Sequence, residues 1–344
     1  MHPEPIIISV LPKPAINQLK EITMPLNFNG KSTADQVLEG IDLTGRRILV
    51  TGVASGIGLE TARSLVAKGA HVVGTVRSLE KAGAAVDVLR GAATGGSGSF
   101  IFIEIDLASL KSVRATAEKL SATKQSFSAV IANAGVMATP HSLTEDGFET
   151  QFATNHLGHF ALITEIAPLI EENGRVVVLS SQVHRVADVD LVDPNFEHQD
   201  YDAFVAYGRS KTANALFAVA FDRRHRERGI RATSVMPGNS LTDLPRNFSE
   251  EQLQGLFATV GKAREEAGLP PAELKTVAQA AATPVWAAIL ADGDEIGGHY
   301  LEDCAVAPVN DLDSPFADGV RSYALDVDTA EALWQKSEAL VRSA

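Results

Sequence analysis

Residues 48–58 read Ile48-Leu49-Val50-Thr51-Gly52-Val53-Ala54-Ser55-Gly56-Ile57-Gly58, an apolar run followed at once by a glycine-rich turn. Glycine has no side chain, so the backbone at these positions can approach a bound pyrophosphate closely. A helical pattern follows at 57–68, and a helix N-terminus offers free N–H groups and a positive dipole end to phosphate. A tight structural turn would also explain the glycines. The position between a first strand and a first helix, with a second apolar run about 20 residues later, favours a dinucleotide-binding turn.

Beyond this turn, short apolar runs alternate with helix-length periodic segments. The runs are apolar throughout, which is typical of parallel strands covered on both faces. We expect strands at 48–50, 72–76, 100–105, 129–132, 176–179 and 232–236, and helices at 57–68, 79–90, 109–122, 145–172 and 201–228. This order predicts an α/β fold with a doubly wound parallel sheet of the Rossmann type.

A length of 344 residues would allow two domains. One is expected, because no second complete set of strands follows the last run. Residues 1–44, which hold five prolines within the first 25, are expected to form an N-terminal extension. Residues 45–344 are expected to form one Rossmann-type domain, in which 239–270 is a C-terminal lid of loop and short helix. Further helices are expected at 273–290 and 328–342.

The composition excludes several classes of partner. The chain has 43 acidic and 30 basic residues, a net charge of −13. Nucleic acids and anionic membranes bind basic surfaces, so neither is an expected partner. No apolar run reaches the roughly 18 residues that cross a bilayer. The single cysteine, Cys304, cannot form an intrachain disulfide and fits a reducing compartment, so a cytoplasmic location is expected.

The turn has the spacing Thr-Gly-x-x-x-Gly-Ile-Gly, not Gly-x-Gly-x-x-Gly, and this spacing resembles the short-chain dehydrogenase/reductase family. The resemblance implies a Rossmann domain that binds a nicotinamide dinucleotide. It also implies that contacts to the cofactor come from the turn itself, at Gly52, Ser55, Gly56, Ile57 and Gly58.

The end of the second strand bears on which dinucleotide is bound. An acidic residue there would bind the ribose 2′-hydroxyl of NAD. Val76 occupies that place, and Arg77 follows it. An arginine can pair with a 2′-phosphate through two hydrogen bonds. We therefore expect NADP(H) to be preferred over NAD(H), the alternative being that Arg77 is an ordinary exposed base.

Two other strand ends match cofactor-binding elements of the family. The resemblance implies that Asp106 and Leu107, after the third strand, lie beside the adenine; Asp106 would alternatively cap the helix that follows. Asn133-Ala134-Gly135, after the fourth strand, corresponds to an element that lines the cofactor cleft, or else is a simple turn.

A third element follows the sixth strand. Pro237 and Gly238, with Thr242 further on, resemble the family's Pro-Gly-x-Val-x-Thr element. The resemblance implies that these residues contact the nicotinamide carboxamide. Ser240 stands where the family usually has valine, which changes the local packing.

Tyr207 and Lys211 lie four residues apart on the expected helix 201–228, so their side chains share one face. A phenol has a pKa of about 10, too high for a base at neutral pH. A nearby ammonium group would lower that pKa. A Tyr-x-x-x-Lys pair also arises by chance, but this one follows the fifth strand, where the family has its catalytic pair. The resemblance implies that Tyr207 is the acid/base and that Lys211 activates it and binds the nicotinamide ribose.

Two further residues would complete the catalytic set. The resemblance implies that Ser181, at the end of the fifth strand, orients the substrate oxygen; Ser180 is the alternative. Asn155 matches the family asparagine that holds a water near the lysine for proton relay, unless it is a polar residue inside a helix. His156 and His159 lack an acidic or cysteine partner, so no metal site is expected.

The substrate is less clearly indicated. The sequence Asn-His-Leu-Gly-His-Phe at 155–160 and the long segment between the serine and the tyrosine resemble the retinol-dehydrogenase-like branch. Apolar residues in 182–206 and 239–270 suggest a small apolar or aromatic carbonyl or alcohol substrate, unless they only pack the lid. They are Phe196, Phe204, Leu241, Leu244, Phe248, Leu253, Leu256 and Phe257.

The expected function is therefore NADP(H)-dependent hydride transfer between a secondary alcohol and a ketone or aldehyde. Two rivals use the same fold. Nucleotide-sugar epimerases and dehydratases usually carry Gly-x-x-Gly-x-x-Gly, and non-catalytic NADP-sensing proteins tend to lose the Tyr/Lys pair. The resemblance to the family also implies that the protein forms a homodimer or homotetramer.

Overall fold

A computed structural model describes residues 28–240 and 250–344. At the centre of these residues lies an eight-stranded sheet in the order β3-β2-β1-β4-β5-β6-β7-β8. The strands are β1 Arg47–Thr51, β2 His71–Val76, β3 Ser99–Glu104, β4 Phe127–Ala132, β5 Ile170–Leu179, β6 Arg231–Met236, β7 Tyr300–Glu302 and β8 Ala305–Val306. All pair in parallel except β8, which returns antiparallel to β7. The predicted doubly wound parallel sheet is confirmed.

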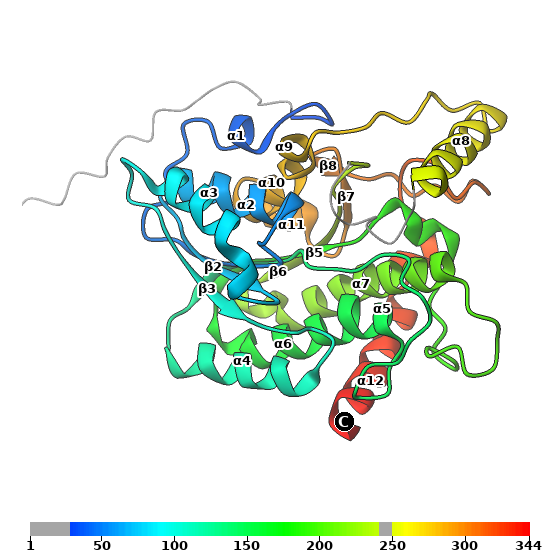
Figure 1. The fold of residues 1–344 in the computed structure, drawn as a ribbon, viewed down its shortest axis with the longest axis horizontal. Helices are drawn as coiled ribbons and strands as arrows, with labels where there is room; N and C mark the ends of the chain where they lie inside the picture. Colours follow the sequence, from blue (N-terminus) through cyan, green and yellow to red (C-terminus); the bar gives the residue numbers. More distant parts are fainter. Residues whose placement is uncertain (1–27, 241–249) are drawn as a thin grey trace, which may run out of the picture.

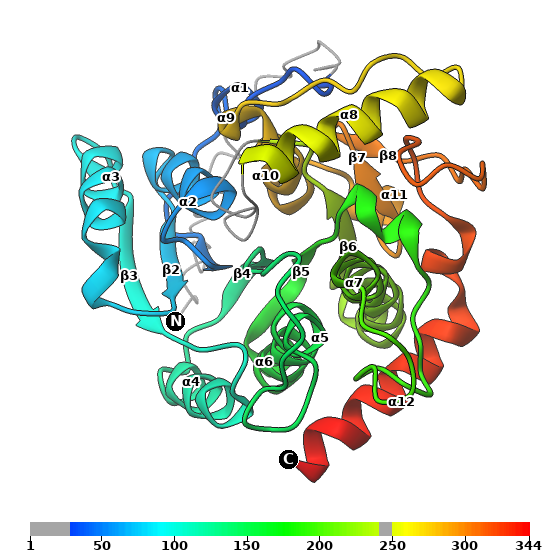
Figure 2. The ribbon, with the colours of Figure 1, turned by 45° about the vertical axis from the view of Figure 1, so that its right-hand side comes forward.

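Helices cover both faces of the sheet. They are α1 Ala34–Val37, α2 Gly56–Ala67, α3 Gly83–Ala93, α4 Leu110–Ala122, α5 Thr150–Phe152, α6 Gly158–Ile166, α7 Ala203–His225, α8 Glu250–Glu266, α9 Val277–Ala280, α10 Ala282–Ile289, α11 Gly293–Ile296 and α12 Val327–Ser343. Figure 1 shows α2, α3 and α10 on one face and α4, α6 and α7 on the other, and Figure 2 shows α12 packed outside α7.

The side chains of β1 explain the two layers, because successive residues of a strand point to opposite faces. Leu49 is buried with α4, α6 and α7, whereas Ile48 and Val50 are buried with α2 and α10. A strand that is apolar at every position is thus buried on both sides. The described part of the expected N-terminal extension also joins the core. Val37 and Leu38 are buried in the same apolar cluster as Ile48 and Val50, on the face of the sheet covered by α2 and α10.

The single helix expected at 145–172 is wrong. The stretch holds α5, a π-helical turn Ala153–Leu157, α6 and a 3-10 turn Ala167–Leu169, and β5 begins at Ile170. Proline has no N–H to donate within a helix, and Pro168 stands where a continuing helix would need one.

Two other expectations change. The helix expected at 273–290 is split into α9 and α10 at Ala281. Pro284 has no N–H, so the carbonyl of Ala280, four residues earlier, lacks its helical hydrogen bond. The segment expected as loop and short helix at 239–270 contains the full helix α8. In the part of the chain that the structure describes, no helix is long and apolar enough to cross a membrane.

Candidate active site

A cleft of about 1160 Å³ opens where the parallel strands end. The chain leaves the sheet in opposite directions after β1 and β4, which is where α/β folds form a ligand crevice. The predicted site residues that line this cleft are Gly52, Ser55, Gly56, Ile57, Gly58, Arg77, Asp106, Leu107, Asn133, Ala134, Gly135, Ser181, Tyr207, Lys211, Pro237 and Gly238. Asn155 is not among the lining residues, and Thr242 lies outside the described residues.

The glycine-rich turn uses left-handed backbone conformations that favour glycine. Gly52 and Gly56 have φ values of +73° and +58°, and a Cβ on Gly58 would overlap the carbonyl oxygen of Gly52. Ser55 precedes α2 but makes no side-chain capping bond. The first N–H groups of α2 therefore remain available to an anion in the cleft.

Thr51 fixes this turn to the neighbouring strand end. Its hydroxyl oxygen accepts hydrogen bonds from the N–H groups of Asn133 and Ala134, each at 2.9 Å. Both lone pairs are thereby used, so the Thr51 hydroxyl donates to His159 Nε2, also at 2.9 Å. The His159 Nδ1–H then donates to the Asn155 carbonyl at 2.9 Å. Burial lowers the pKa of His159 to about 4, in keeping with this neutral form.

Arg77 and Asp106 meet at the far end of the cleft. Arg77 Nε lies 3.5 Å from Asp106 Oδ2, and the Arg77 side chain is 77% exposed. Ser109 caps α4 by accepting from Ser112 N–H, so Asp106 is not the helix cap considered above. An exposed ion pair of this length contributes little to stability and leaves both side chains able to turn toward a ligand.

Tyr207 and Lys211 lie on the same face of α7 and are 3% and 4% exposed. Lys211 Nζ lies 5.6 Å from the centre of the Tyr207 ring and donates to the Leu179 carbonyl at 3.0 Å. Burial lowers the pKa of Lys211 to about 8. Burial also raises the pKa of Tyr207 to about 12, and a hydrogen bond with Ser181 lowers it only in part. The lowered tyrosine pKa expected from the sequence is therefore wrong here, because desolvation of the phenolate is the larger effect.

Ser181 is held in place by residues that the motifs did not reveal. Its carbonyl oxygen accepts from the Tyr300 hydroxyl at 3.0 Å and from His184 Nδ1 at 2.8 Å. His184 Nε2 accepts from the Arg321 backbone N–H at 3.1 Å, which places the ring proton on Nδ1. The alternative serine, Ser180, donates its hydroxyl to the Lys211 carbonyl at 2.8 Å and so ties the end of β5 to α7.

Asn155 lies in the π-helical turn behind the cleft wall. Its side-chain amide exchanges two hydrogen bonds with the backbone of Val136, at 2.8 and 2.9 Å, and also donates to Ser210 Oγ at 2.9 Å. A Cβ on Gly135 would lie 3.1 Å from Asn155 Oδ1 and 3.5 Å from Lys211 Nζ. The glycine therefore keeps open the space between the asparagine and the lysine.

A model of the short chain dehydrogenase family matches residues 46–253. The chain belongs to the short-chain dehydrogenase/reductase family. A Streptomyces lividans protein named "probable oxidoreductase" is 38% identical over 300 residues, which are 86% of this chain and 97% of that protein. The human WW domain-containing oxidoreductase is 34% identical over 92% of this chain and 72% of its own length.

A solved structure of an uncharacterized protein from Mycobacterium paratuberculosis has a TM-score of 0.63 and 31% identity, and the match covers 88% of this chain and 95% of that one. The protein is thus an oxidoreductase of the short-chain dehydrogenase/reductase family, and the family implies a nicotinamide dinucleotide cofactor.

The family match ends at residue 253, but one wall of the cleft is built from later residues. They are Val260, Gly261, Glu265, Leu269, Pro271, Ala272, Leu274 and Phe316. Of the apolar residues expected at the substrate, Phe204 lines the cleft, whereas Phe196 is buried elsewhere against Tyr201 and Arg209. The others, which are Leu241, Leu244, Phe248 and the side chains of Leu253, Leu256 and Phe257, lie outside the described part of the chain.

Proposed function

We propose that the protein is an NADP(H)-dependent oxidoreductase that interconverts a secondary alcohol and a ketone or aldehyde. The observation that carries the proposal is the meeting of Ser181, Tyr207 and Lys211 in one cleft at the ends of the parallel strands. Hydride transfer to a carbonyl requires the protein to bind the carbonyl oxygen, to protonate it and to stabilise the charge that remains. Ser181, Tyr207 and Lys211 would supply these three functions in that order.

The residues present fit a nicotinamide dinucleotide, which would supply the hydride. The free N–H groups of Gly56, Ile57 and Gly58 would bind the pyrophosphate, and Arg77 would bind a 2′-phosphate. Asp106 and Leu107 would lie beside the adenine. The nicotinamide half would be enclosed by Asn133, Ala134, Gly135, Pro237 and Gly238, and Lys211 would bind its ribose.

The protonation states favour proton donation to a carbonyl. With a pKa of about 12, Tyr207 holds its proton at neutral pH and can give it to the developing alkoxide. Ser181 would donate a hydrogen bond to the same oxygen. Lys211, with a pKa of about 8, is charged at neutral pH and would stabilise the phenolate that remains. Asn155 would keep the neighbouring wall in place through Val136.

The substrate that fits best is a neutral apolar or aromatic carbonyl compound or the matching alcohol. Beyond the catalytic residues the cleft is lined by Val183, Phe204, Val260, Leu269, Leu274 and Phe316. Glu265 is the charged side chain on this wall, which disfavours anionic substrates.

The test is Tyr207→Phe, which keeps the ring and removes the proton carrier. Reduction of a panel of ketones and aldehydes, followed by NADPH absorbance, should fall by at least about 100-fold while NADPH binding stays within about twofold. Turnover retained in this variant would contradict the assignment. Product formation without net NADPH consumption would indicate an epimerase or dehydratase, and NADPH binding with no turnover in the wild type would indicate a sensor.

A further inference from the structure

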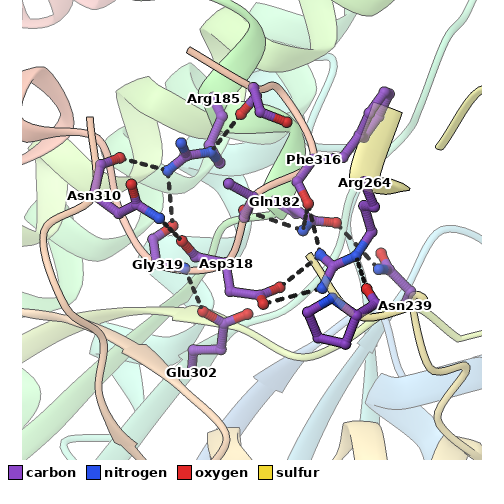
Figure 3. A network of polar contacts seen from close by, with 12 residues as sticks. Gln182, Arg185, Asn239, Arg264, Glu302, Asn310, Phe316, Asp318 and Gly319 are labelled. Atoms are coloured by element: carbon purple, nitrogen blue, oxygen red, sulfur yellow. Dashed lines mark hydrogen bonds and ion pairs between the residues drawn. The ribbon is translucent and has the colours of Figure 1, made fainter. Parts of the chain in front are cut away.

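The segment between β8 and the 3-10 turn Ser322–Leu325 returns to the cleft and is held there mainly through its backbone (Figure 3). Arg185, in the turn that follows Ser181, is 4% exposed. Its guanidinium donates to the carbonyl oxygens of Asn310 at 2.8 Å, Leu312 at 2.9 Å and Ser314 at 3.1 Å. The segment is therefore fixed relative to the proposed catalytic serine although it has no regular secondary structure.

Phe316 occupies the centre of this segment, and two side chains hold its carbonyl oxygen. Gln182 Nε2, from the residue next to Ser181, donates at 3.0 Å, and Arg264 Nη1 donates at 2.7 Å. Arg264 also forms two hydrogen bonds with the Asp318 carboxylate, at 2.8 and 3.1 Å. Arg264 belongs to α8 and Gln182 to the 3-10 turn that follows Ser181. These contacts therefore join the lid and that turn to the return segment, which runs from β8 to Ser322, at Phe316 (Figure 3).

Phe316 is shared by two hollows of the molecule. It lines the main cleft and also an adjoining hollow of about 430 Å³. Phe204, at the start of α7, is the other residue that lines both. The remaining residues around the hollow are Arg185, Val186, Asp313, Ser314, Pro315 and Arg321. The two phenylalanines thus form the wall between the catalytic cleft and this hollow.

We propose that Phe316 is a specificity-determining residue that ends the substrate site at this wall, and that Gln182 and Arg264 are positioning residues that hold it there. The proposal rests on the proposed carbonyl reductase function and deepens it. A substrate with one aromatic ring would fit on the cleft side of Phe316. A substrate with a second ring would need the adjoining hollow, on the other side of Phe316.

The experiment compares two neutral ketones, acetophenone with one ring and benzophenone with two. In Phe316→Ala, the ratio of kcat/KM for benzophenone to that for acetophenone should rise at least about tenfold, because the hollow becomes part of the cleft. Phe316→Trp should lower the ratio. Leu312→Ala is the matched control, since Leu312 belongs to the same segment, is 46% exposed and lines neither cavity. A ratio that stays within twofold of wild type in Phe316→Ala overturns the proposal.

The positioning role has its own variants. Arg264→Lys keeps the charge but cannot hold Phe316 and Asp318 together in the fork that arginine provides. It should shift the same ratio in the same direction as Phe316→Ala. Asp318→Asn keeps the bond from Arg264 to Phe316 and should shift the ratio less. A loss of thermal stability in Arg264→Lys with an unchanged ratio would show that Arg264 is merely structural.

A binding measurement separates this proposal from the proposed function. Titration calorimetry of both ketones into wild type and Phe316→Ala, each saturated with NADP+, which has no hydride to give to a ketone, yields a ratio of Kd values without turnover. If neither protein reduces a ketone but the Kd ratio shifts about tenfold, the proposed function fails and the role of Phe316 stands. An unchanged Kd ratio, or no binding of either ketone to Phe316→Ala, overturns the role of Phe316 whatever the turnover.

Discussion

The Tyr300 hydroxyl donates a hydrogen bond to the main-chain carbonyl of Ser181 at 3.0 Å. Ser181 follows β5 and Tyr300 begins β7, and β6 lies between these two strands in the sheet. The same carbonyl accepts from His184, whose ring lies 4.8 Å from the Tyr300 ring. The position of the Ser181 backbone therefore depends on a strand that comes much later in the chain.

Tyr300→Phe removes this donor and keeps the ring that packs on His184. We expect kcat for carbonyl reduction to fall about 3- to 10-fold, the effect of losing one hydrogen bond of ordinary strength, with KM for NADPH unchanged. Steady-state kinetics on the wild type and the variant measure both. A fall in thermal stability with kcat unchanged would mean that Tyr300 serves only the core.

Lys211→Met should separate stability from activity. Burial lowers the pKa of Lys211 from 10.5 to about 8, so the folded protein carries the cost of a buried charge at pH 7. Removal of the charge should raise the free energy of unfolding by about 1–3 kcal/mol and lower turnover by at least about 100-fold. Urea denaturation at pH 7 measures the first effect.

The same substitution has a defined pH dependence. Between pH 8 and 10.5 the unfolded wild-type chain binds a proton at Lys211 that the folded protein does not bind, so wild-type stability rises with pH in this range. The stability advantage of Lys211→Met should therefore shrink between pH 8 and 10. An advantage that is constant with pH would contradict a buried ammonium as its source.

The rate of carbonyl reduction should fall as the pH rises above about 8. Lys211 loses its charge there, whereas Tyr207 keeps its proton up to about pH 12. A pH profile of kcat/KM for reduction, measured at saturating NADPH, would show the decline. A profile that is flat to pH 10 would separate Lys211 from the chemical step.

Arg77→Ala should change the cofactor preference. We expect KM for NADPH to rise about 10- to 100-fold and KM for NADH to change less than about threefold, since Arg77 would contact only the 2′-phosphate. Arg90→Ala is the matched control, because Arg90 is 70% exposed and also pairs with a nearby aspartate. Equal losses with both cofactors would assign Arg77 a structural role.

Much of the cleft lining around the glycine-rich turn was predictable, because each element is a short continuous motif at a strand end. Gly52, residues 55–58 and residues 133–135 all line the cleft, as their glycines and their place after a strand indicated. A wall from the expected lid 239–270 was predicted, but the part that Phe316 contributes was not. Arg264 holds the Phe316 backbone and Tyr300 holds the Ser181 backbone through contacts that are distant in sequence. The pKa of Tyr207 was predicted in the wrong direction because the loss of water around its ring depends on the complete fold.

Arg185 gives the return segment an anchor that does not depend on the identity of its residues. Each carbonyl oxygen that it binds belongs to the main chain, which every amino acid carries. Side chains such as Phe316 can therefore be replaced while the segment keeps its path. A substitution at Phe316 would in this way alter the wall of the cleft and leave in place the turn that follows Ser181.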